Sequence, residues 1–243
     1  MKKLIALLMV LALAVSFAAC GTTEPATTEP DAEIDAMTYE EFMAAETDAE
    51  VTVVTYVQAA QGWWNDQITV YAQSPDGAYF LYNMACSEED AAKLVPGTKI
   101  IVTGVKAVWS GEVEIMEATF EFANDGETFI AEAADVTALL GTDALEAEMN
   151  KFVAFNGLTV EAANEAGDAF LYNWDGSGEA GSDCDLYFTA GGTTFVIEYY
   201  LTGPDSEAYK AVQNLKVGDT INMEGFLYWY EGPQAHITSV TVQ

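Results

Sequence analysis

Residues 94–115 read "LVPGTKIIVTGVKAVWSGEVEI", and residues 215–236 read "LKVGDTINMEGFLYWYEGPQAH". Self-similarity at one fixed spacing indicates a structural unit that is used twice. Each copy contains a glycine turn, an alternating strand, a hairpin near a second glycine, and another alternating strand. The two stretches align at a constant offset of 121, which pairs Leu94 with Leu215, Gly97 with Gly218, Ile100 with Ile221, Gly104 with Gly225 and Gly111 with Gly232.

Each copy is preceded by further strand signals and by one short helix. Ser87 and Thr202 each have an aspartate three residues later, Asp90 and Asp205, which is typical of a capping box. The order is therefore three strands, a helix and two strands, twice over. The first three strands are expected at 51–57, 68–73 and 78–84 in the first copy, and at 152–160, 185–190 and 193–200 in the second.

This order resembles the OB-fold, a five-stranded Greek-key barrel that has its helix between strands 3 and 4. The phrase "GDTINMEG" at 218–225 is similar to the start of strand 4 in OB-fold proteins. We therefore predict an all-β protein with short helices, built from two tandem OB-fold-like five-stranded barrels. Another all-β barrel or a sandwich would give similar strand signals.

The predicted domains follow from this repeat and from the composition of the N-terminus. Residues 124–150, which connect the two modules, look partly helical and are similar to residues 38–50. This segment is either a small helix that plugs one barrel end or a plain connection. The predicted parts are a signal peptide (1–19), a flexible Thr/Glu/Pro tether (20–37), a first module (38–123), a connecting segment (124–150) and a second module (151–243).

The N-terminus reads "MKKLIALLMVLALAVSFAAC", two lysines followed by an apolar run that ends in two alanines and Cys20. This layout is typical of a secretory signal peptide, and its ending resembles the lipobox of bacterial lipoproteins. The resemblance implies a diacylglycerol on the Cys20 sulfur, cleavage before Cys20, and a protein anchored to the outer side of the cell membrane. The alternative is an ordinary signal peptide in which Cys20 has no such role.

The chain carries 39 acidic residues against eight lysines and no arginine, a formal net charge of −31. Binding to nucleic acid relies on clustered Lys and Arg that neutralise phosphates. We therefore expect no nucleic-acid partner. Acidity of this kind favours solubility outside the cell.

All five tryptophans fall in two classes of predicted loop. Trp63, Trp64 and Trp174 fall between strands 1 and 2, whereas Trp109 and Trp229 fall at the hairpins between strands 4 and 5, with Tyr230 next to Trp229. These loops flank the ligand face of OB-folds. Adjacent strand residues point to opposite faces, so we expect at least one of Trp63 and Trp64 to be exposed. The predicted ligand-binding residues are Trp63, Trp64, Trp109, Trp174, Trp229 and Tyr230.

Function is predicted from these loops. We expect a non-catalytic binding module for an extracellular ligand, a glycan or a peptide, without a cofactor. The alternative is a structural or assembly lipoprotein whose aromatic loops contact the other module or another protein. No catalytic motif is present, and His236 is the only histidine.

Two smaller features leave alternatives open. Residues 175–185 are rich in Asp and Gly, but an EF-hand register starting at Asp175 would place Ala180 and Leu186 where Gly and Glu are needed. A solvated acidic loop is expected, with an irregular calcium site as the alternative. Cys86 and Cys184 form either one disulfide or two buried thiols.

The lipid anchor is testable in the intact cell. Changing Cys20→Ala removes the acceptor sulfur, so we expect the protein to leave the membrane fraction for the soluble fraction. Fractionation with an immunoblot measures this, and Cys86→Ala is the matched control. A Cys20→Ala variant that still sediments with membranes contradicts the lipidation prediction.

Overall fold

The computed structural model describes residues 35–186 and 192–243, and residues Asp35–Gln243 form one compact unit. The predicted signal peptide, Cys20 and most of the tether lie outside the described residues, so their roles stay predictions. The described part is mostly β with a few short helices. Among the described residues, no helix is long and apolar enough to cross a membrane.

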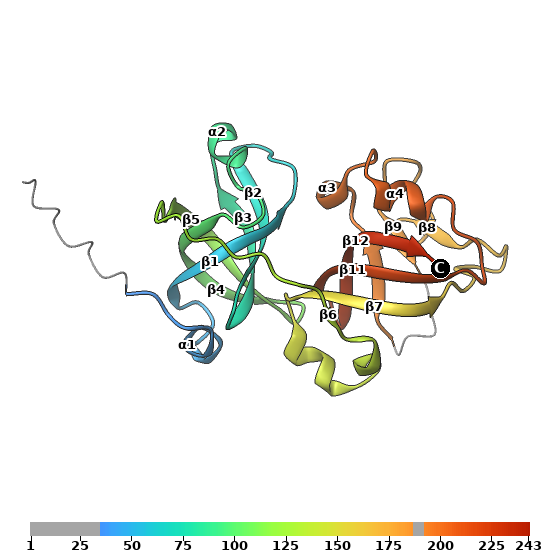
Figure 1. The fold of residues 1–243 in the computed structure, drawn as a ribbon, viewed down its shortest axis with the longest axis horizontal. Helices are drawn as coiled ribbons and strands as arrows, with labels where there is room; N and C mark the ends of the chain where they lie inside the picture. Colours follow the sequence, from blue (N-terminus) through green and yellow to red (C-terminus); the bar gives the residue numbers. More distant parts are fainter. Residues whose placement is uncertain (1–34, 187–191) are drawn as a thin grey trace, which may run out of the picture. The chain divides into compact units, whose positions relative to one another are not determined.

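The first half is the closed five-stranded barrel that the sequence predicts, with strand order β1-β2-β3-β5-β4 (Figure 1). Burial alternates along β1 and β4, which places every second side chain in the barrel core. Its elements are α1 (Tyr39–Ala44), β1 (Glu50–Ala60), β2 (Gln67–Ser74), β3 (Gly77–Ala85), α2 (Glu88–Ala91), β4 (Lys99–Trp109) and β5 (Glu112–Phe122).

Helix α1 covers part of the barrel core, which is the first of the two alternatives that the sequence leaves open for such segments. Thr38 and Glu41 form a complete capping box at its start. Phe42 is 1% exposed and belongs to the barrel core. At the other end of the helix, Lys106 Nζ donates to the carbonyl oxygens of Met43 and Ala45.

The second half is an open sheet and not a second closed barrel, which corrects the prediction of two barrels. Strand β2 is eight residues long and pairs with both β1 and β3, whereas β8 and β9 have three residues each and are separated by a glycine-rich loop. They are too short to reach β7 and close the sheet. The sheet order is β6-β7-β11-β12-β10-β9-β8, formed by β6 (Ala134–Asp135), β7 (Phe152–Thr159), β8 (Phe170–Tyr172), β9 (Cys184–Leu186), β10 (Thr194–Ile197), β11 (Thr220–Trp229) and β12 (Pro233–Val242).

Two further expectations for the second half are also wrong in detail. The strand expected at 193–200 ends at Ile197 and is followed by helix α3 (Tyr199–Thr202). Helix α4 (Glu207–Val212) is capped by Ser206 and not by Thr202, whereas Ser87 caps α2 as predicted. Residues 187–191, which cover most of the strand expected at 185–190, lie outside the described residues.

The sequence repeat has a clear structural basis. Strands β4 and β11 begin at Lys99 and Thr220, which are 121 residues apart. Both strands have a β-bulge at the repeated glycine. A Cβ on Gly104 would lie 2.8 Å from the Met116 carbonyl oxygen, and one on Gly225 would collide with the His236 carbonyl oxygen. Only glycine lets the partner strand approach this closely.

The connecting segment contains two 3₁₀ turns, η1 (Thr137–Leu139) and η2 (Asp143–Glu148), which agrees with a partly helical connection. Leu145 of η2 is 1% exposed and lies in the core of the second half. Cys86 and Cys184 are both buried free thiols. This settles the choice between a disulfide and two thiols.

The barrel and the open sheet meet through four aromatic side chains, Tyr71, Phe80, Phe226 and Tyr228, which form a separate buried cluster. The two repeated hairpins also touch, because Glu231 N donates to the Ser110 carbonyl at 2.7 Å. We call these four side chains the aromatic junction.

Glu112 is a buried carboxyl beside this junction. Its Oε2 accepts a hydrogen bond from Trp229 N at 2.8 Å, while Glu112 Oε1 and Asn150 Oδ1 have no hydrogen-bond partner among the described residues. Burial raises the pKa of Glu112 to about 8, although the nearby Asn150 side chain and the hydrogen bond from Trp229 N lower it. A proton on Oε1 gives the neighbouring Asn150 Oδ1 a donor, so we assign the neutral form at pH 7.

Neutral Glu112 makes stability depend on pH. The folded state keeps this proton between about pH 4.5 and about pH 8, where the unfolded chain loses it, so the free energy of unfolding falls as the pH rises through that range. We expect Glu112→Gln, a neutral mimic, to remove this slope and to stabilise the protein at pH 8.5 by roughly 2–5 kcal/mol. Urea unfolding at several pH values measures it. Glu121→Gln, on the exposed side of the same strand, is the control; equal slopes in wild type and Glu112→Gln would refute the assignment.

Candidate functional site

A groove of about 1000 Å³ lies between the barrel and the open sheet. The barrel contributes β3, the hairpin after β4 and residue Gln61. The open sheet contributes its outer face and the loop between β8 and β9. The lining residues are Gln61, Phe80, Tyr82, Asn83, Trp109, Asn173, Trp174, Asp183, Asp185, Thr194, Val196, Glu198, Tyr228, Tyr230, Gln234 and His236.

Side chains alternate between the two faces of each strand, and this alternation decides which residues form the floor of the groove. Asp185 lies between Cys184 and Leu186, which both point into the core of the second half. The same alternation puts Val196 and His236 on the outer face. Strand pairing sets Asp185 opposite Val196, and Val196 opposite His236, so these three side chains form one row across the sheet.

Aromatic rings form much of the groove wall. Trp109 and Tyr230, which occupy equivalent positions at the offset of 121, lie with their ring centroids 5.2 Å apart. Trp174 is 77% exposed, Trp109 is 51% exposed and Tyr230 is 45% exposed. Deeper in, Phe80 and Tyr228 pack with ring centroids 5.0 Å apart. The exposed rings and the packed rings together form an aromatic wall that a ligand in the groove can contact.

Glu198, the residue before α3, is held by side chains of the barrel. Gln61 Nε2 donates to both of its oxygens, at 2.8 and 2.9 Å, and Tyr71 Oη lies 3.1 Å from Oε2. Burial raises the pKa of Glu198 to about 7; the Tyr71 hydrogen bond lowers it and the charge of Asp183 raises it. This carboxyl therefore changes its charge near neutral pH.

His236 is buried behind Glu198. Its Nδ1 lies 2.6 Å from Tyr71 Oη, and its Nε2 lies 3.3 Å from Gln234 Oε1. Burial lowers the pKa of His236 to about 3, so the ring is neutral at pH 7. Burial also raises the pKa of Tyr71 well above its usual value, so the phenol keeps its proton.

Asp185 is the carboxylate in the groove that has neither a hydrogen-bond donor nor a positive charge beside it among the described residues. It is 5% exposed, and burial and the charge of Asp183 act on its carboxylate without a hydrogen bond from another described residue. Its oxygens are not among the fully buried atoms that lack a partner, because the side chain faces the groove. Burial and then the neighbouring charge of Asp183 raise its pKa to about 6. Asp183 itself accepts a hydrogen bond from Tyr199 N at 2.7 Å. A desolvated, unpaired carboxylate is costly to the fold, so Asp185 indicates a cationic ligand.

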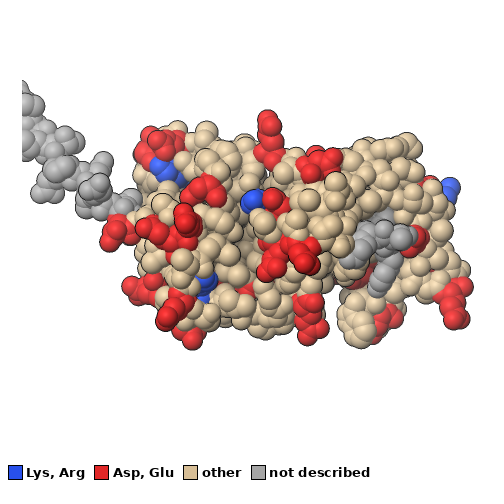
Figure 2. Space-filling model, turned by 90° about the horizontal axis from the view of Figure 1, so that it is seen from below, with Lys and Arg blue, Asp and Glu red and all other residues tan. Residues whose placement is uncertain are grey.

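The charge of the groove is negative throughout. Its lining includes Asp183, Asp185 and Glu198, and no lysine is among the described lining residues. Figure 2 shows Asp and Glu side chains scattered over one face of the molecule, with few lysines among them. A cation is therefore attracted to the protein and meets no competing positive side chain in the groove.

The structure divides the residues that the sequence predicts for ligand binding. Trp109, Trp174 and Tyr230 line the groove. Trp63 lines a separate, smaller cavity of about 550 Å³ and donates through Nε1 to the Cys86 carbonyl, while Trp64 is 73% exposed outside any described cavity. Trp229 packs against Gly111 in the other hairpin. The exposure of Trp64 agrees with the expectation for the adjacent pair.

Sequence reasoning missed the polar part of the site. Asp185, Glu198 and His236 come from three different elements and meet only in the folded chain. One usable signal was the alternation of Asp185 with the apolar residues Cys184 and Leu186, which indicates a buried strand with one acidic side chain on its outer face.

The loop at 175–185 is not arranged as a calcium site. Asp175 accepts a hydrogen bond from Ser177 N, and Asp183 caps α3 through Tyr199 N. Among the described residues, no group of three or more His, Cys, Asp or Glu side chains is placed to hold a metal ion.

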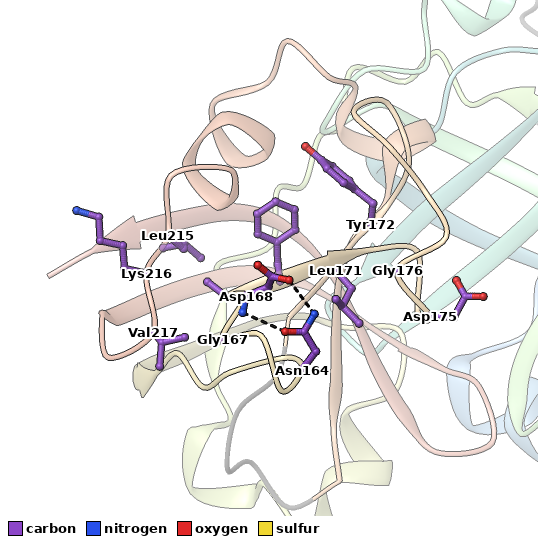
Figure 3. A pocket seen from close by; sticks show the side chains of 12 residues that line it. Asn164, Gly167, Asp168, Leu171, Tyr172, Asp175, Gly176, Leu215, Lys216 and Val217 are labelled. Carbon is purple, nitrogen blue, oxygen red and sulfur yellow. Dashed lines mark hydrogen bonds between the residues drawn. The ribbon is translucent and has the colours of Figure 1, made fainter.

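A third cavity, of about 720 Å³, lies between residues 164–176 and residues 215–217 (Figure 3). In this view Asn164 and Asp168 point toward each other, and two hydrogen bonds join them, while Lys216 and Asp175 lie at opposite ends. Because its central polar groups satisfy one another, this cavity has less chemistry to offer a ligand than the groove.

No family model matches the chain, and no curated protein is similar to it. Two solved structures have a limited likeness to it, each with 12% sequence identity and a TM-score of 0.33. The crystal structure of the tetrameric p202 HIN2 matches over 82% of this chain and 95% of its own. The crystal structure of the Ifi202 HINa domain in complex with 20 bp dsDNA matches over 80% of this chain and 98% of its own.

Two predictions from the sequence are corrected at this point. The expected extracellular glycan or peptide ligand and the expected exclusion of nucleic acid disagree with this comparison and are withdrawn, because the similar structures are HIN domains and one of them is a complex with dsDNA. A likeness of TM-score 0.33 assigns no ligand to this chain, so the ligand has to follow from the groove itself.

Asp185 offers a test of the unpaired carboxylate. Its raised folded pKa of about 6 means that the free energy of unfolding falls as the pH rises from about 4 to about 6. We expect Asp185→Asn to stabilise the protein at pH 7.5 by about 1–3 kcal/mol, since it removes a desolvated charge. Thermal and urea unfolding measure this, and Asp205→Asn at an exposed position is the control. A destabilised Asp185→Asn variant would mean that the carboxylate is satisfied within the fold.

Proposed function

We propose that this protein binds a small organic cation, a quaternary ammonium or a protonated amine, in the groove between the barrel and the open sheet. The observation that carries this proposal is Asp185, a buried carboxylate on the groove floor with no hydrogen-bond partner among the described residues. A protein retains such a destabilising group where a ligand supplies the missing charge.

The aromatic wall supports an organic cation over an inorganic one. A cation within about 6 Å of a Trp or Tyr ring gains about 0.5–2 kcal/mol from the ring quadrupole. Trp109, Trp174 and Tyr230 lie at the mouth, above the acidic floor. An alkylammonium contacts rings and carboxylate together, whereas a small hydrated metal ion needs several oxygen ligands.

The size of the groove supports a small ligand. Its volume of about 1000 Å³ lies at the upper end of the range of roughly 300–1000 Å³ for small-molecule sites. Its polar and aromatic residues come from both halves, so both halves hold the ligand.

We propose binding without chemical conversion. The histidine in the groove has a pKa lowered to about 3 by burial, which makes it a poor base at neutral pH. The polar atoms of Tyr71 and His236 are also engaged by protein partners, Tyr71 Oη with His236 Nδ1 and His236 Nε2 with Gln234 Oε1.

The location of the protein is part of the same proposal. Residues 1–20 have the layout of a lipoprotein signal, and residues 21–37 have the composition of a solvated tether. We propose a lipid anchor on Cys20 and display on the outer side of the cell membrane. There the groove would meet cations dissolved outside the cell.

We also propose that the second half is an OB-fold-like module whose barrel is opened. Its strands β7, β11, β12, β10 and β9 follow the same neighbour order as β1, β4, β5, β3 and β2 of the barrel. In both halves a parallel pair joins the equivalent strands, β3 with β5 and β10 with β12.

Calorimetry with choline and its neutral isostere 3,3-dimethylbutan-1-ol tests the proposed ligand class. The two molecules have nearly the same shape, so we expect choline to bind at least tenfold more tightly because it alone carries the charge. Trp174→Ala, Trp109→Ala and Asp185→Asn should each weaken choline binding about three- to thirtyfold.

The matched control is Trp64→Ala, which removes an exposed tryptophan outside the groove and should leave choline affinity unchanged. The proposal fails if choline, tetramethylammonium and cadaverine all show no binding. It also fails if the neutral isostere binds as tightly as choline, or if Trp64→Ala weakens binding as much as Trp174→Ala does.

A further inference from the structure

One chain of hydrogen-bonding groups connects the groove to the aromatic junction. It runs from Glu198 Oε2 to Tyr71 Oη over 3.1 Å, from Tyr71 Oη to His236 Nδ1 over 2.6 Å, and from His236 Nε2 to Gln234 Oε1 over 3.3 Å. Tyr71 comes from β2, His236 and Gln234 come from β12, and Glu198 precedes α3. The chain therefore crosses from the open sheet to the barrel and back.

Proton counting favours two arrangements of this chain, in which Tyr71 Oη stands between Glu198 Oε2 and His236 Nδ1. These last two atoms also lie 3.4 Å apart, so an Nδ1–H can point toward the carboxylate as well as toward Tyr71. Tyr71 has a single hydroxyl proton, but both Glu198 Oε2 and His236 Nδ1 lie within reach of it. A neutral imidazole carries one proton, on Nδ1 or on Nε2. The direction in which Tyr71 donates therefore fixes which nitrogen of His236 is protonated.

The charge of Glu198 selects between the two arrangements. When Glu198 is ionised, Tyr71 donates to Glu198 and His236 donates to Tyr71 through Nδ1–H. When Glu198 is protonated, its own proton is donated to Tyr71, Tyr71 donates to Nδ1, and the imidazole proton sits on Nε2 facing Gln234 Oε1. The histidine stays neutral in both arrangements.

We propose that a cation entering the groove displaces the proton of Glu198 into solvent and switches His236 from the Nε2–H to the Nδ1–H tautomer. This inference rests on the proposed function, since it adds proton coupling to the same site. The exchange balances: one positive charge enters and one proton leaves. The carboxyl O–H bond of Glu198 and the Nε2–H bond of His236 are broken and one Nδ1–H bond is formed, so one of the two protons stays on the imidazole and the other passes to solvent.

The surroundings of Glu198 favour this exchange. From the barrel it faces Gln61, a neutral donor, and Tyr71. From the open sheet it faces His236, Tyr228 and the negative charge of Asp183, with Asp185 on the same groove floor. Among these described neighbours no cation holds Glu198 ionised. The pKa of Glu198 is about 7, so this carboxyl is about half protonated at pH 7 in the absence of a ligand. A bound cation shifts Glu198 toward its ionised form.

The chain contains one histidine, which makes the switch measurable in the intact protein. Long-range ¹H–¹⁵N spectra distinguish the two tautomers by the shifts of Nδ1 and Nε2. With an empty groove, we expect Nδ1–H at pH 9, Nε2–H at pH 5, a midpoint near 7, and no imidazolium. At pH 7, saturating choline should move the population to Nδ1–H.

Binding should show the same coupling. Calorimetry in buffers of different ionisation enthalpy should detect release of roughly half a proton for each choline bound at pH 7, and choline affinity should rise about tenfold from pH 6 to pH 8. Glu198→Gln, which cannot ionise, should abolish the tautomer titration, the proton release and most of this pH dependence. The control Glu207→Gln, on the exposed face of α4, should retain all three.

The outcomes separate this inference from the proposed function. Choline binding without proton release, with the His236 tautomer unchanged between pH 5 and 9, overturns the coupling and leaves the cation site standing. Absence of binding at every pH, with the tautomer still titrating through Glu198, overturns the proposed function and this exchange with it. A tautomer change that persists in Glu198→Gln overturns the assignment of the proton to Glu198.

Discussion

The hydrogen bond between Tyr71 and His236 is the contact on which the site depends. It is buried, it joins two residues 165 positions apart, and it lies beside the stacked rings of the aromatic junction. Buried polar groups that satisfy one another give an interface a single defined geometry. With this contact in place, the outer faces of β3 and of β10–β12 stand opposite each other, and the space between them becomes a groove. Neither half supplies that groove alone, because its lining residues come from both.

The raised pKa values of several buried carboxyl groups follow from the same packing. Glu112, Glu198 and Asp185 all have raised pKa values, and burial is the first cause in each case. They differ in what surrounds them. Glu112 lies beside the unsatisfied Asn150 oxygen and serves the junction as a neutral group, Glu198 has donors on two sides, and Asp185 has none among the described residues. Similar desolvation thus leaves Glu112 protonated at pH 7, gives Glu198 a proton that it exchanges near pH 7, and leaves Asp185 with an unpaired charge.

Local patterns predicted the barrel well, because they are encoded within a few residues. The repeated glycines at 104 and 225, the Ser87 cap and the alternation in β4 all act through neighbours in sequence or through one paired strand. Closure of the second sheet depends on the lengths of β8 and β9. The glycine-rich loop between them makes the ends of these strands hard to predict from the sequence. The polar half of the site was out of reach for another reason. Asp185, Glu198 and His236 have no shared spacing, and only the register of three strands and the start of α3 brings them together.

The aromatic wall over an acidic floor also has a consequence for selectivity among ions. Outside the groove the acidic side chains attract every cation, and salt screens that attraction beyond about 8 Å at physiological ionic strength. Inside it, an ion must exchange part of its hydration shell for ring faces that donate no oxygen ligand. Sodium and potassium lose more by that exchange than an alkylammonium does. The aromatic walls therefore favour binding of cations that lose their hydration water easily, while the acidic floor selects only for positive charge.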